Sequence, residues 1–237
     1  MRLLVTRPER DAQRTGAALS ARGHEVRIAP LLKIEAIAGA DLGAAPWQAL
    51  LMTSANAAWA IAAHPKLAEL HSLPVLAVGR RTAEAARATG FAEVTSADGS
   101  AGGLARLVAG RVSAGAPLLY LAGSDRARDL AADLAPYGIA VRTVEIYRAR
   151  AAEEFPPEVV AALRADHIEG VLHFSRRSAE IFVQCAECAG VAAAALRPLQ
   201  FCISAQAAEP LARARADKIR IAAQPEEDAL VALIGSA

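Results

Sequence analysis

Residues 50–59, LLMTSANAAW, predict a buried strand that ends in small polar residues and leads directly into a helix. The apolar run stops at Thr53, Ser54 and Asn56, which carry no charge and do not form the G-x-S-x-G pattern of a hydrolase nucleophile. The same succession of a short apolar run and a helical stretch recurs along the whole chain. That pattern is typical of a parallel sheet covered by helices.

Ten segments of this kind predict ten strands, which divide naturally into two sheets of five. Alanine-rich stretches with helical periodicity separate them, as expected for helices packed closely on sheets. The predicted strands lie at residues 3–6, 25–30, 49–54, 75–79, 92–96, 118–123, 141–147, 170–175, 201–204 and 218–223.

An internal repeat indicates two domains. Ser54 and Gly79 end successive strands in a first copy, and Ser175 and Ser204 do so in a second copy at a similar spacing. A strand–helix–strand unit at residues 1–30 precedes the first copy, and a similar unit at residues 118–147 precedes the second. Each copy has enough strands for its own sheet, which favours duplicated domains over a solenoid.

The order of the strands predicts that one domain is discontinuous. If the five strands from 49–54 to 141–147 form one sheet, the other sheet must combine the first two strands with the last three. Because the chain then crosses twice between domains, we expect a hinge and a cleft. The expected boundaries are a discontinuous domain of residues 1–34 and 153–237, a continuous domain of residues 40–147, and a connector of residues 35–39 and 148–152.

Composition argues against several classes of protein. The 237-residue chain is 54% hydrophobic with a formal net charge of +1, so we expect neither a nucleic-acid partner nor a membrane surface. The first residues, MRLLVTRPERD, contain no long apolar run, and we expect a cytoplasmic protein. Cys185 and Cys188 form a C-x-x-C within a helical pattern, where two reduced thiols without a role are expected.

Motifs for cofactors are missing from the sequence. The first strand is followed by TRPERD instead of G-x-G-x-x-G, and no G-x-x-x-x-G-K-[ST] occurs, so nucleotide binding is not expected. The five histidines have no spacing that pairs them with acids in a metal site. We therefore expect no cofactor and no metal, and we interpret His173 as a core histidine.

The candidate binding residues follow the strands, because ligands of parallel sheets bind beyond the carboxyl ends of strands, near helix N-termini. Hydroxyls recur there, although one hydroxyl per helix start is expected from N-capping alone. Arginines occur in four of the six turns. A guanidinium at a helix N-terminus lies near the positive end of the helix dipole, which is unfavourable unless a bound anion interacts with both. The turns, which together predict a polyanionic ligand, are residues 6–8, 53–56, 79–82, 122–126, 175–178 and 204–206.

Several segments, taken in order, resemble the uroporphyrinogen-III synthase family over nearly the whole chain. They are LLVTRPERDA, QALLMTSANAAW, VLAVGRRTAEAARATGF and GVLHFSRRSAEIF. The resemblance implies an α/β fold with two similar domains, each a five-stranded parallel sheet flanked by helices, and a two-stranded connector. It also implies a cofactor-independent lyase of tetrapyrrole (haem) biosynthesis that acts on hydroxymethylbilane, a linear substrate with eight carboxylates.

The family's reaction closes the macrocycle with loss of water and inverts ring D, passing through an azafulvene and a spiro-pyrrolenine. The resemblance therefore implies a small-molecule substrate, handed over from the upstream bilane-forming enzyme. A monomer is expected.

Matching motifs imply which residues bind the substrate. Two features depart from the family pattern: the last turn, at 204–208, lacks its usual glycine and threonine, and residues 151–174 contain no tyrosine for the leaving hydroxyl. Tyr147, at the end of a strand, is a weak candidate for the acid, with packing at the hinge as the alternative. The substrate-binding candidates are Thr6, Arg7, Ser54, Ala55, Asn56, Gly79, Arg80, Thr82, Gly123, Ser124, Ser175, Arg176, Ser178 and Ser204.

Two other functions fit the same sequence. Two α/β lobes joined by a hinge also build non-catalytic ligand-binding proteins. A degenerate synthase-like domain that has lost its activity is the third interpretation, and the altered turn at 204–208 favours it.

Overall fold

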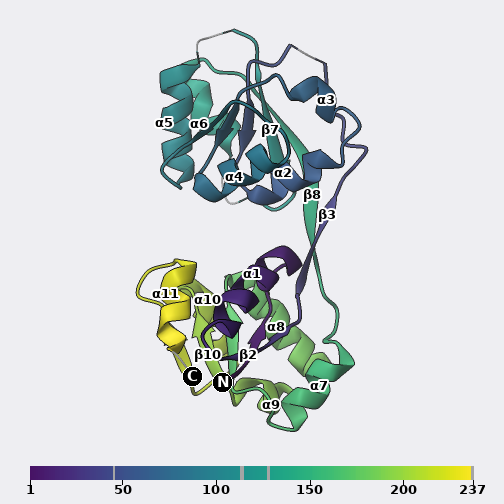
Figure 1. The fold of residues 1–237 in the computed structure, drawn as a ribbon, viewed down its shortest axis with the longest axis vertical. Helices are drawn as coiled ribbons and strands as arrows, with labels where there is room; N and C mark the ends of the chain where they lie inside the picture. Colours follow the sequence, from purple (N-terminus) through teal and green to yellow (C-terminus); the bar gives the residue numbers. More distant parts are fainter. Residues whose placement is uncertain (45, 113–114, 127–128, 236–237) are drawn as a thin grey trace. The chain divides into compact units, whose positions relative to one another are not determined.

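The structure, a computed structural model, describes residues 1–44, 46–112, 115–126 and 129–235. The chain forms two compact units (Figure 1). Met1–Lys33 and Arg150–Ala237 make up the first, which we call the discontinuous unit, and Ile34–Ala149 make up the second, the continuous unit.

The discontinuous unit contains a five-stranded sheet in the order β11-β10-β9-β1-β2, in which all neighbouring strands are parallel. Helices cover both of its faces (Figure 1). Its elements are β1 (Arg2–Val5), α1 (Glu9–Ser20), β2 (Glu25–Ile28), α7 (Pro157–Arg164), β9 (Gly170–His173), α8 (Arg176–Cys188), α9 (Ala192–Leu196), β10 (Leu199–Cys202), α10 (Ala205–Arg213), β11 (Ile219–Ile221) and α11 (Glu227–Ile234).

One core of this unit lies between the sheet and helices α1 and α11. Leu3 and Val5 of β1 pack there with Leu19 of α1 and Leu230 of α11. The side chains that alternate with them point to the other face, where Phe182 of α8 packs edge-on against His173 of β9. Strands buried on both faces explain the continuous apolar runs in the sequence.

The continuous unit contains a six-stranded sheet in the order β3-β8-β7-β4-β5-β6, and the strands from β8 to β6 are parallel. Its elements are β3 (Leu32–Ala36), which begins just before the unit, β4 (Leu50–Met52), α2 (Ala55–Ala62), α3 (Leu67–Leu70), β5 (Val75–Ala77), α4 (Arg80–Ala88), β6 (Val94–Ser96), α5 (Ala101–Arg111), β7 (Leu118–Gly123), α6 (Leu130–Leu134), the 3-10 helix Ala135–Tyr137 and β8 (Val141–Ala151).

Each face of this sheet has its own core. Alanines of α2 and α4 pack on Leu50 and Met52, whereas Leu104 of α5 and Leu130 of α6 pack on Leu51. Alternate residues of β4 therefore serve opposite cores. Small alanine side chains bring α2 and α4 close to the sheet, as the composition predicted.

The α/β class and the parallel sheets are confirmed, and each of the ten predicted strands is present. The prediction of two five-stranded sheets is wrong for the continuous unit, because β3 adds a sixth strand. Backbone pairing with the long strand β8 defines this edge strand: the Ile37 N–H donates to the Ile146 carbonyl at 2.8 Å. Its sequence, LKIEA, lacks the apolar run that marks the buried strands.

The two sheets have the same spatial order once the start of the repeat is shifted. In the continuous unit the strands β4, β5, β6, β7 and β8 are arranged as 3-2-1-4-5, counted from β4. The discontinuous unit has this order when counting begins at β9 and continues through β11 to β1 and β2. The units are thus circular permutations of one arrangement, in agreement with the internal repeat.

None of the described helices is both long and apolar enough to cross a lipid bilayer.

Candidate active site

Each unit has one point where the strand order reverses. In the continuous unit β4 and β7 are neighbours, and in the discontinuous unit β9 and β1 are neighbours. The chain leaves the two strands of each pair toward opposite sides, which opens a crevice beyond their carboxyl ends where ligands of α/β sheets bind. The turns after these four strands contain Ser54, Gly123, Ser175 and Thr6.

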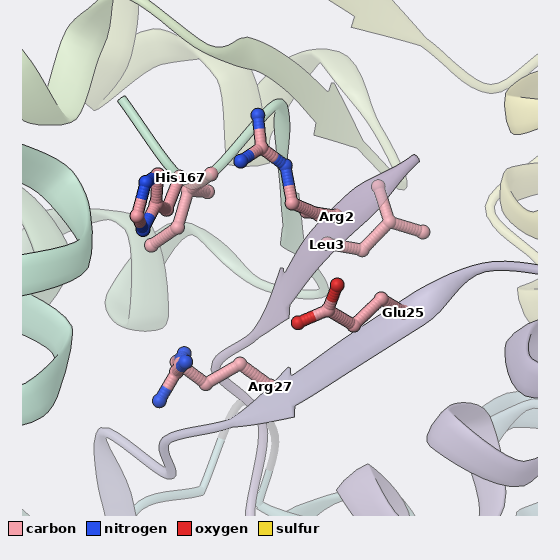
Figure 2. Close-up of a pocket in the computed structure, with 6 residues that line it drawn as sticks. Arg2, Leu3, Glu25, Arg27 and His167 are labelled. Atoms are coloured by element: carbon pink, nitrogen blue, oxygen red, sulfur yellow. The ribbon is translucent and has the colours of Figure 1, made fainter. Parts of the chain in front are cut away.

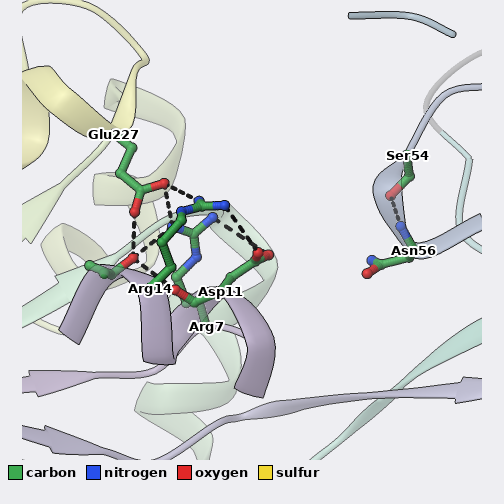
Figure 3. A network of polar contacts seen from close by, with 7 residues as sticks. Arg7, Asp11, Arg14, Ser54, Asn56 and Glu227 are labelled. Carbon is green, nitrogen blue, oxygen red and sulfur yellow. Dashed lines mark hydrogen bonds and ion pairs between the residues drawn. The ribbon is translucent and has the colours of Figure 1, made fainter. Parts of the chain in front are cut away.

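The turn after β4 presents an uncharged helix start. Ser54 is the N-cap of α2, and its hydroxyl accepts a hydrogen bond from the Asn56 N–H at 3.1 Å (Figure 3). The Thr53 hydroxyl is hydrogen-bonded to the Tyr120 hydroxyl at 2.7 Å, while Ala55 is buried. Within the described residues the Asn56 side-chain amide has no hydrogen-bond partner and is half-buried. It is therefore available to a ligand.

Tyr147 lies beside this turn because of an irregularity in the pairing of β7 with β8. Ala122 pairs with Glu145, but Gly123 pairs with Tyr147, so β8 has one extra residue at this point. A Cβ atom on Gly123 would lie 2.7 Å from the Tyr147 ring, so only glycine leaves room for the phenol. Burial raises the pKa of Tyr147, and a hydrogen bond with the Ser54 side chain acts in the opposite direction.

The turn after β7 is held by the same strand. The Ser124 N–H donates to the Tyr147 carbonyl at 3.0 Å. Arg126 donates to the Gly123 carbonyl at 3.2 Å and forms an ion pair with Glu145 at 2.8 Å. Hydrogen bonds from Arg126 and Ser124 lower the pKa of Glu145. This arrangement joins the Gly123–Ser124 turn to the middle of β8.

The turns after β9 and β10 repeat the N-cap of α2. Ser175 caps α8 by accepting from the Ser178 N–H at 3.1 Å, and Ser204 caps α10 by accepting from the Ala207 N–H at 3.3 Å. Ser178 is buried, and its hydroxyl contacts the Ser175 carbonyl oxygen at 3.0 Å. Ser204 thus keeps the capping role of the altered last turn although the glycine and threonine are missing there.

After β5, a glycine allows two stretches of backbone to approach closely. Gly79 is the N-cap of α4, and a Cβ atom on it would lie 3.2 Å from the Cα atom of Gly99. Thr82 is buried in the first turn of α4, whereas Arg80 before it has a side chain that is 92% exposed. Of these residues, Arg80 is open to solvent.

Thr6 and Arg7 have partners inside the discontinuous unit. The buried Thr6 hydroxyl donates to the Leu172 carbonyl at 3.0 Å. The Arg7 guanidinium is also buried, and it pairs with Glu227 at 2.9 Å and with Asp11 at 3.6 Å (Figure 3). Its Nε is buried without a partner among the described residues. The sequence could not reveal Glu227 at this position, because it belongs to the last helix.

The other strand-end arginines also have carboxylate partners. Arg176 pairs with Glu180 at 2.9 Å and with Glu209 at 3.3 Å, and Arg80 approaches Glu84 at 3.9 Å. An arginine near a helix start therefore needs no bound anion to explain it here. The exposed pairs are weak, so a ligand carboxylate can still compete for these two guanidinium groups.

The helix starts themselves favour anions. The first turns of α2, α4, α5, α8 and α10, all described by the structure, contain no acidic residue. Acids do occupy the first turns of α1, α7 and α11. The helix dipole thus remains uncompensated by a first-turn acid on the helices that follow β4, β5, β9 and β10. Just before α5, by contrast, the Asp98 carboxylate accepts a hydrogen bond from the Ser100 N–H at 3.0 Å.

A pocket in the discontinuous unit lies at the opposite ends of the strands. It has a volume of about 190 Å³ and is lined by Arg2, Leu3, Glu25, Arg27, His167 and Ile168 (Figure 2). Arg2 and Glu25 are paired residues at the starts of β1 and β2. Charges of both signs line this pocket, so it does not match the predicted polyanion.

The cysteines and histidines do not form a further centre in the described chain. Within the described residues, no three His, Cys, Asp or Glu side chains are grouped to hold a metal ion. Cys185 is buried and Cys188 is exposed on α8, and burial raises the pKa of the Cys185 thiol. A thiol with a raised pKa is a poor nucleophile at neutral pH.

Comparison with known proteins supplies the family. The family model for uroporphyrinogen-III synthase HemD matches residues 13–232. The chain belongs to the uroporphyrinogen-III synthase family. Among curated proteins, no match is found.

Solved structures of the family share the fold. A uroporphyrinogen-III synthetase from Helicobacter pylori aligns with a TM-score of 0.66 and 18% identity, covering 99% of this chain and 98% of that one. A mutant uroporphyrinogen III synthase from Thermus thermophilus aligns with a TM-score of 0.52 and 15% identity, covering 99% and 96%. At these identities, the structures support the fold and not individual site residues.

Proposed function

We propose that this chain is a uroporphyrinogen-III synthase, which cyclises hydroxymethylbilane with loss of water and inversion of ring D. The observation that carries the proposal is the family match over residues 13–232. The acid-free helix starts support it independently, because the linear tetrapyrrole carries eight carboxylates and helix N-termini bind such groups.

The carboxylates are bound by main-chain N–H groups and hydroxyls. In the continuous unit the donors come from 54–56, 79–82 and 123–124, and in the discontinuous unit from 175–178 and 204. Hydrogen bonds to carboxylates are stronger than those between neutral groups, so several such turns can hold a flexible polyanion in one conformation. Arg80 and Arg176 add charge at the margin of the turns.

Tyr147 is the proposed proton donor to the leaving hydroxyl. The ordinary pKa of a tyrosine, 10.0, already keeps the phenol protonated at neutral pH, and burial raises the pKa of Tyr147 further, so its hydroxyl can donate a hydrogen bond. As the C–O bond of the hydroxymethyl group breaks, the hydroxyl leaves as water with the donated proton and the azafulvene forms in its protonated, cationic state. The proton lost when the macrocycle regains its aromatic pyrrole restores the acid, so the net change is loss of one water.

Selectivity between the two possible ring closures depends on how ring D is positioned relative to the azafulvene. Direct closure at the free carbon of ring D gives isomer I without an enzyme, whereas attack at the substituted carbon gives the spiro-pyrrolenine and then isomer III. Holding the carboxylates of ring D so that the substituted carbon faces the azafulvene supplies the preference. Hydrogen-bond donors at helix N-termini suit this task, because the fold already fixes their positions and they do not need to move during the reaction.

The remaining features of the proposal concern the molecule as a whole. We propose domains of residues 1–34 with 153–237 and of residues 40–147, connected by 35–39 and 148–152. The enzyme is a cofactor-independent carbon–oxygen lyase, cytoplasmic and monomeric, that takes its substrate from the bilane-forming enzyme.

Freshly generated hydroxymethylbilane tests the proposal. We expect the purified chain to give mainly the isomer III product, measured by chromatography after oxidation of the macrocycle. Buffer without protein provides the control, since it yields isomer I. Only isomer I with the protein present would contradict the proposal, and a non-catalytic binding protein or a degenerate synthase-like domain would then be the better interpretation.

A further inference from the structure

The end of β1 contacts the segment that leads into the Ser175 turn. Thr6 donates its hydroxyl hydrogen to the Leu172 carbonyl at 3.0 Å, and the Arg7 guanidinium lies 4.0 Å from the centroid of the Phe174 ring. Thr6 is 0% exposed and Arg7 is 8% exposed. Because Ser175 follows Phe174 directly, these two contacts fix the residues just before the N-cap of α8.

Arg7 is itself held by the carboxylate of Glu227 in the first turn of α11. The Arg7 Nη1 atom lies 2.9 Å from Glu227 Oε2 and donates to the Thr15 hydroxyl at 3.0 Å. Thr15 donates to the other carboxylate oxygen at 2.5 Å, and Arg14 pairs with the same carboxylate (Figure 3). Burial alone would raise the pKa of Glu227, but the hydrogen bond from Thr15 and the charge of Arg7 lower it.

We propose that Glu227 is a positioning residue, which holds Arg7 over the Phe174 ring and thereby fixes the Ser175 turn for a substrate carboxylate. The inference rests on the proposed function. It assigns Thr6 and Arg7 to the same positioning task, so neither binds the substrate directly. Helix α11 thus affects the Ser175 turn indirectly, through Arg7 and Phe174.

The geometry explains why a carboxylate is needed at position 227. A guanidinium interacts with an aromatic face only when it is held over the ring, and Glu227 with Thr15 fixes the position of the Arg7 Nη1 atom. Without the Glu227 charge, the buried Arg7 would lie beside Arg14, and its ion pair with Asp11 spans a longer 3.6 Å. A buried cation that loses its main counterion is expected to turn toward water. Arg7 would then leave Phe174.

The variant Glu227→Gln tests this, with Asp228→Asn as the matched control. Asp228 is exposed in the same helical turn, and its replacement removes the same charge. In the full chain we expect Glu227→Gln to raise KM for hydroxymethylbilane roughly tenfold with kcat much less affected, and to lower the fraction of isomer III. Glu227→Asp, which keeps the charge, should recover part of the loss, and Asp228→Asn should match the wild type.

Hydrogen exchange supplies a readout that does not depend on activity. The Ser178 amide donates to the Ser175 hydroxyl, so its exchange reports on the turn. We expect faster exchange at residues 175–178 in Glu227→Gln than in Asp228→Asn. Equal KM and equal exchange in the two variants would overturn the inference, even if Glu227→Gln unfolds at a lower temperature. A wild-type chain that makes only isomer I would refute the proposed function, while the exchange comparison would still decide the positioning role.

Discussion

Tyr147 lies within β8 (Val141–Ala151) and not at the end of the strand, where the sequence had predicted it, and its ring lies against Gly123. From the sequence, packing at the hinge was the favoured interpretation of this residue, and a role as the acid was the weaker one. The extra residue in β8 places the phenol at the reversal of strand order, beside the acid-free start of α2. That position is what makes it the proposed donor.

Replacing Tyr147 with Phe removes the hydroxyl and keeps the ring. We expect kcat for isomer III formation to fall by about 10²-fold, since general acids contribute on that order, with the thermal unfolding temperature little changed. The measurement is a steady-state assay with hydroxymethylbilane. Tyr137→Phe is the control, because Tyr137 is 56% exposed outside the site. A kcat within about twofold of the wild type would exclude Tyr147 as the acid.

His173 is a buried neutral imidazole. Its Nε2 lies 2.9 Å from Gln200 Oε1, and the Gln200 amide nitrogen donates to the carbonyls of Ala195 and Pro198. Gln200 Oε1 is therefore an acceptor, His173 Nε2 carries the hydrogen, and His173 Nδ1 is buried without a partner among the described residues. The interpretation as a core histidine agrees with this environment.

Acid should destabilise the fold through His173. Burial lowers its pKa from 6.5 to about 4, so between these values the unfolded chain binds more protons than the folded one. Stability is thus lost as pH falls from about 6.5 toward 4, by about 3 kcal/mol for this group. We expect urea unfolding at pH 7 and pH 4.5 to show a smaller acid loss in His173→Gln than in the wild type.

The control for this pH effect is His167→Gln, because the His167 side chain is exposed in the same unit. It should lose as much stability in acid as the wild type. If His173→Gln lost the same free energy of unfolding as the other two proteins, the buried imidazole would not be the group responsible.

At the scale of secondary structure, the junction of β7 and β8 depends on a glycine. Gly123→Ala would place a Cβ atom 2.7 Å from the Tyr147 ring, so the phenol must move. We expect a loss of about 1–3 kcal/mol in the free energy of unfolding, as in other overpacked sites, together with lower synthase activity. Denaturant unfolding and the isomer III assay measure the two effects.

Gly110→Ala is a matched control in the same unit. Gly110 lies in α5 with nothing within 4 Å of an added Cβ atom. Alanine favours helix, so this variant should be neutral or up to about 1 kcal/mol more stable. A Gly123→Ala protein as stable and active as Gly110→Ala would show that Tyr147 does not depend on the space at Gly123.

Local sequence was sufficient to predict most strands and helix starts, because a buried strand and a helix N-cap each have a residue pattern that spans only a few positions. The runs around Leu50 and Leu119 predicted buried strands, and Ser54, Ser175 and Ser204 predicted helix starts. Strand β3 was not among the ten strands predicted from apolar runs, since its pairing with β8 depends on backbone hydrogen bonds. Only the family resemblance implied a strand there, in the two-stranded connector of residues 35–39 and 148–152. The carboxylate partners of the arginines were missed for a similar reason: Glu227 and Glu209 come from other elements.

At the scale of the whole molecule, the sequence predicted the duplication but not the order of strands in space. The spacing of Ser54, Gly79, Ser175 and Ser204 contains no information on which strands are neighbours. The structure places β7 beside β4 and β1 beside β9, which brings four polar turns to two reversal points. The candidate residues were therefore identified one by one, and their grouping required the coordinates.

The permuted order of the discontinuous unit has a consequence for synthesis on the ribosome. Strands β1 and β2 are made first, yet β1 pairs with β9, and β9 is translated only after the entire continuous unit. The apolar side chains of Leu3, Leu4 and Val5 therefore lack their β9 neighbours during this interval, while the continuous unit can already fold. Strand β1 thus reaches its β9 neighbour only long after its own synthesis, and during that interval its apolar residues would be a natural target for chaperones.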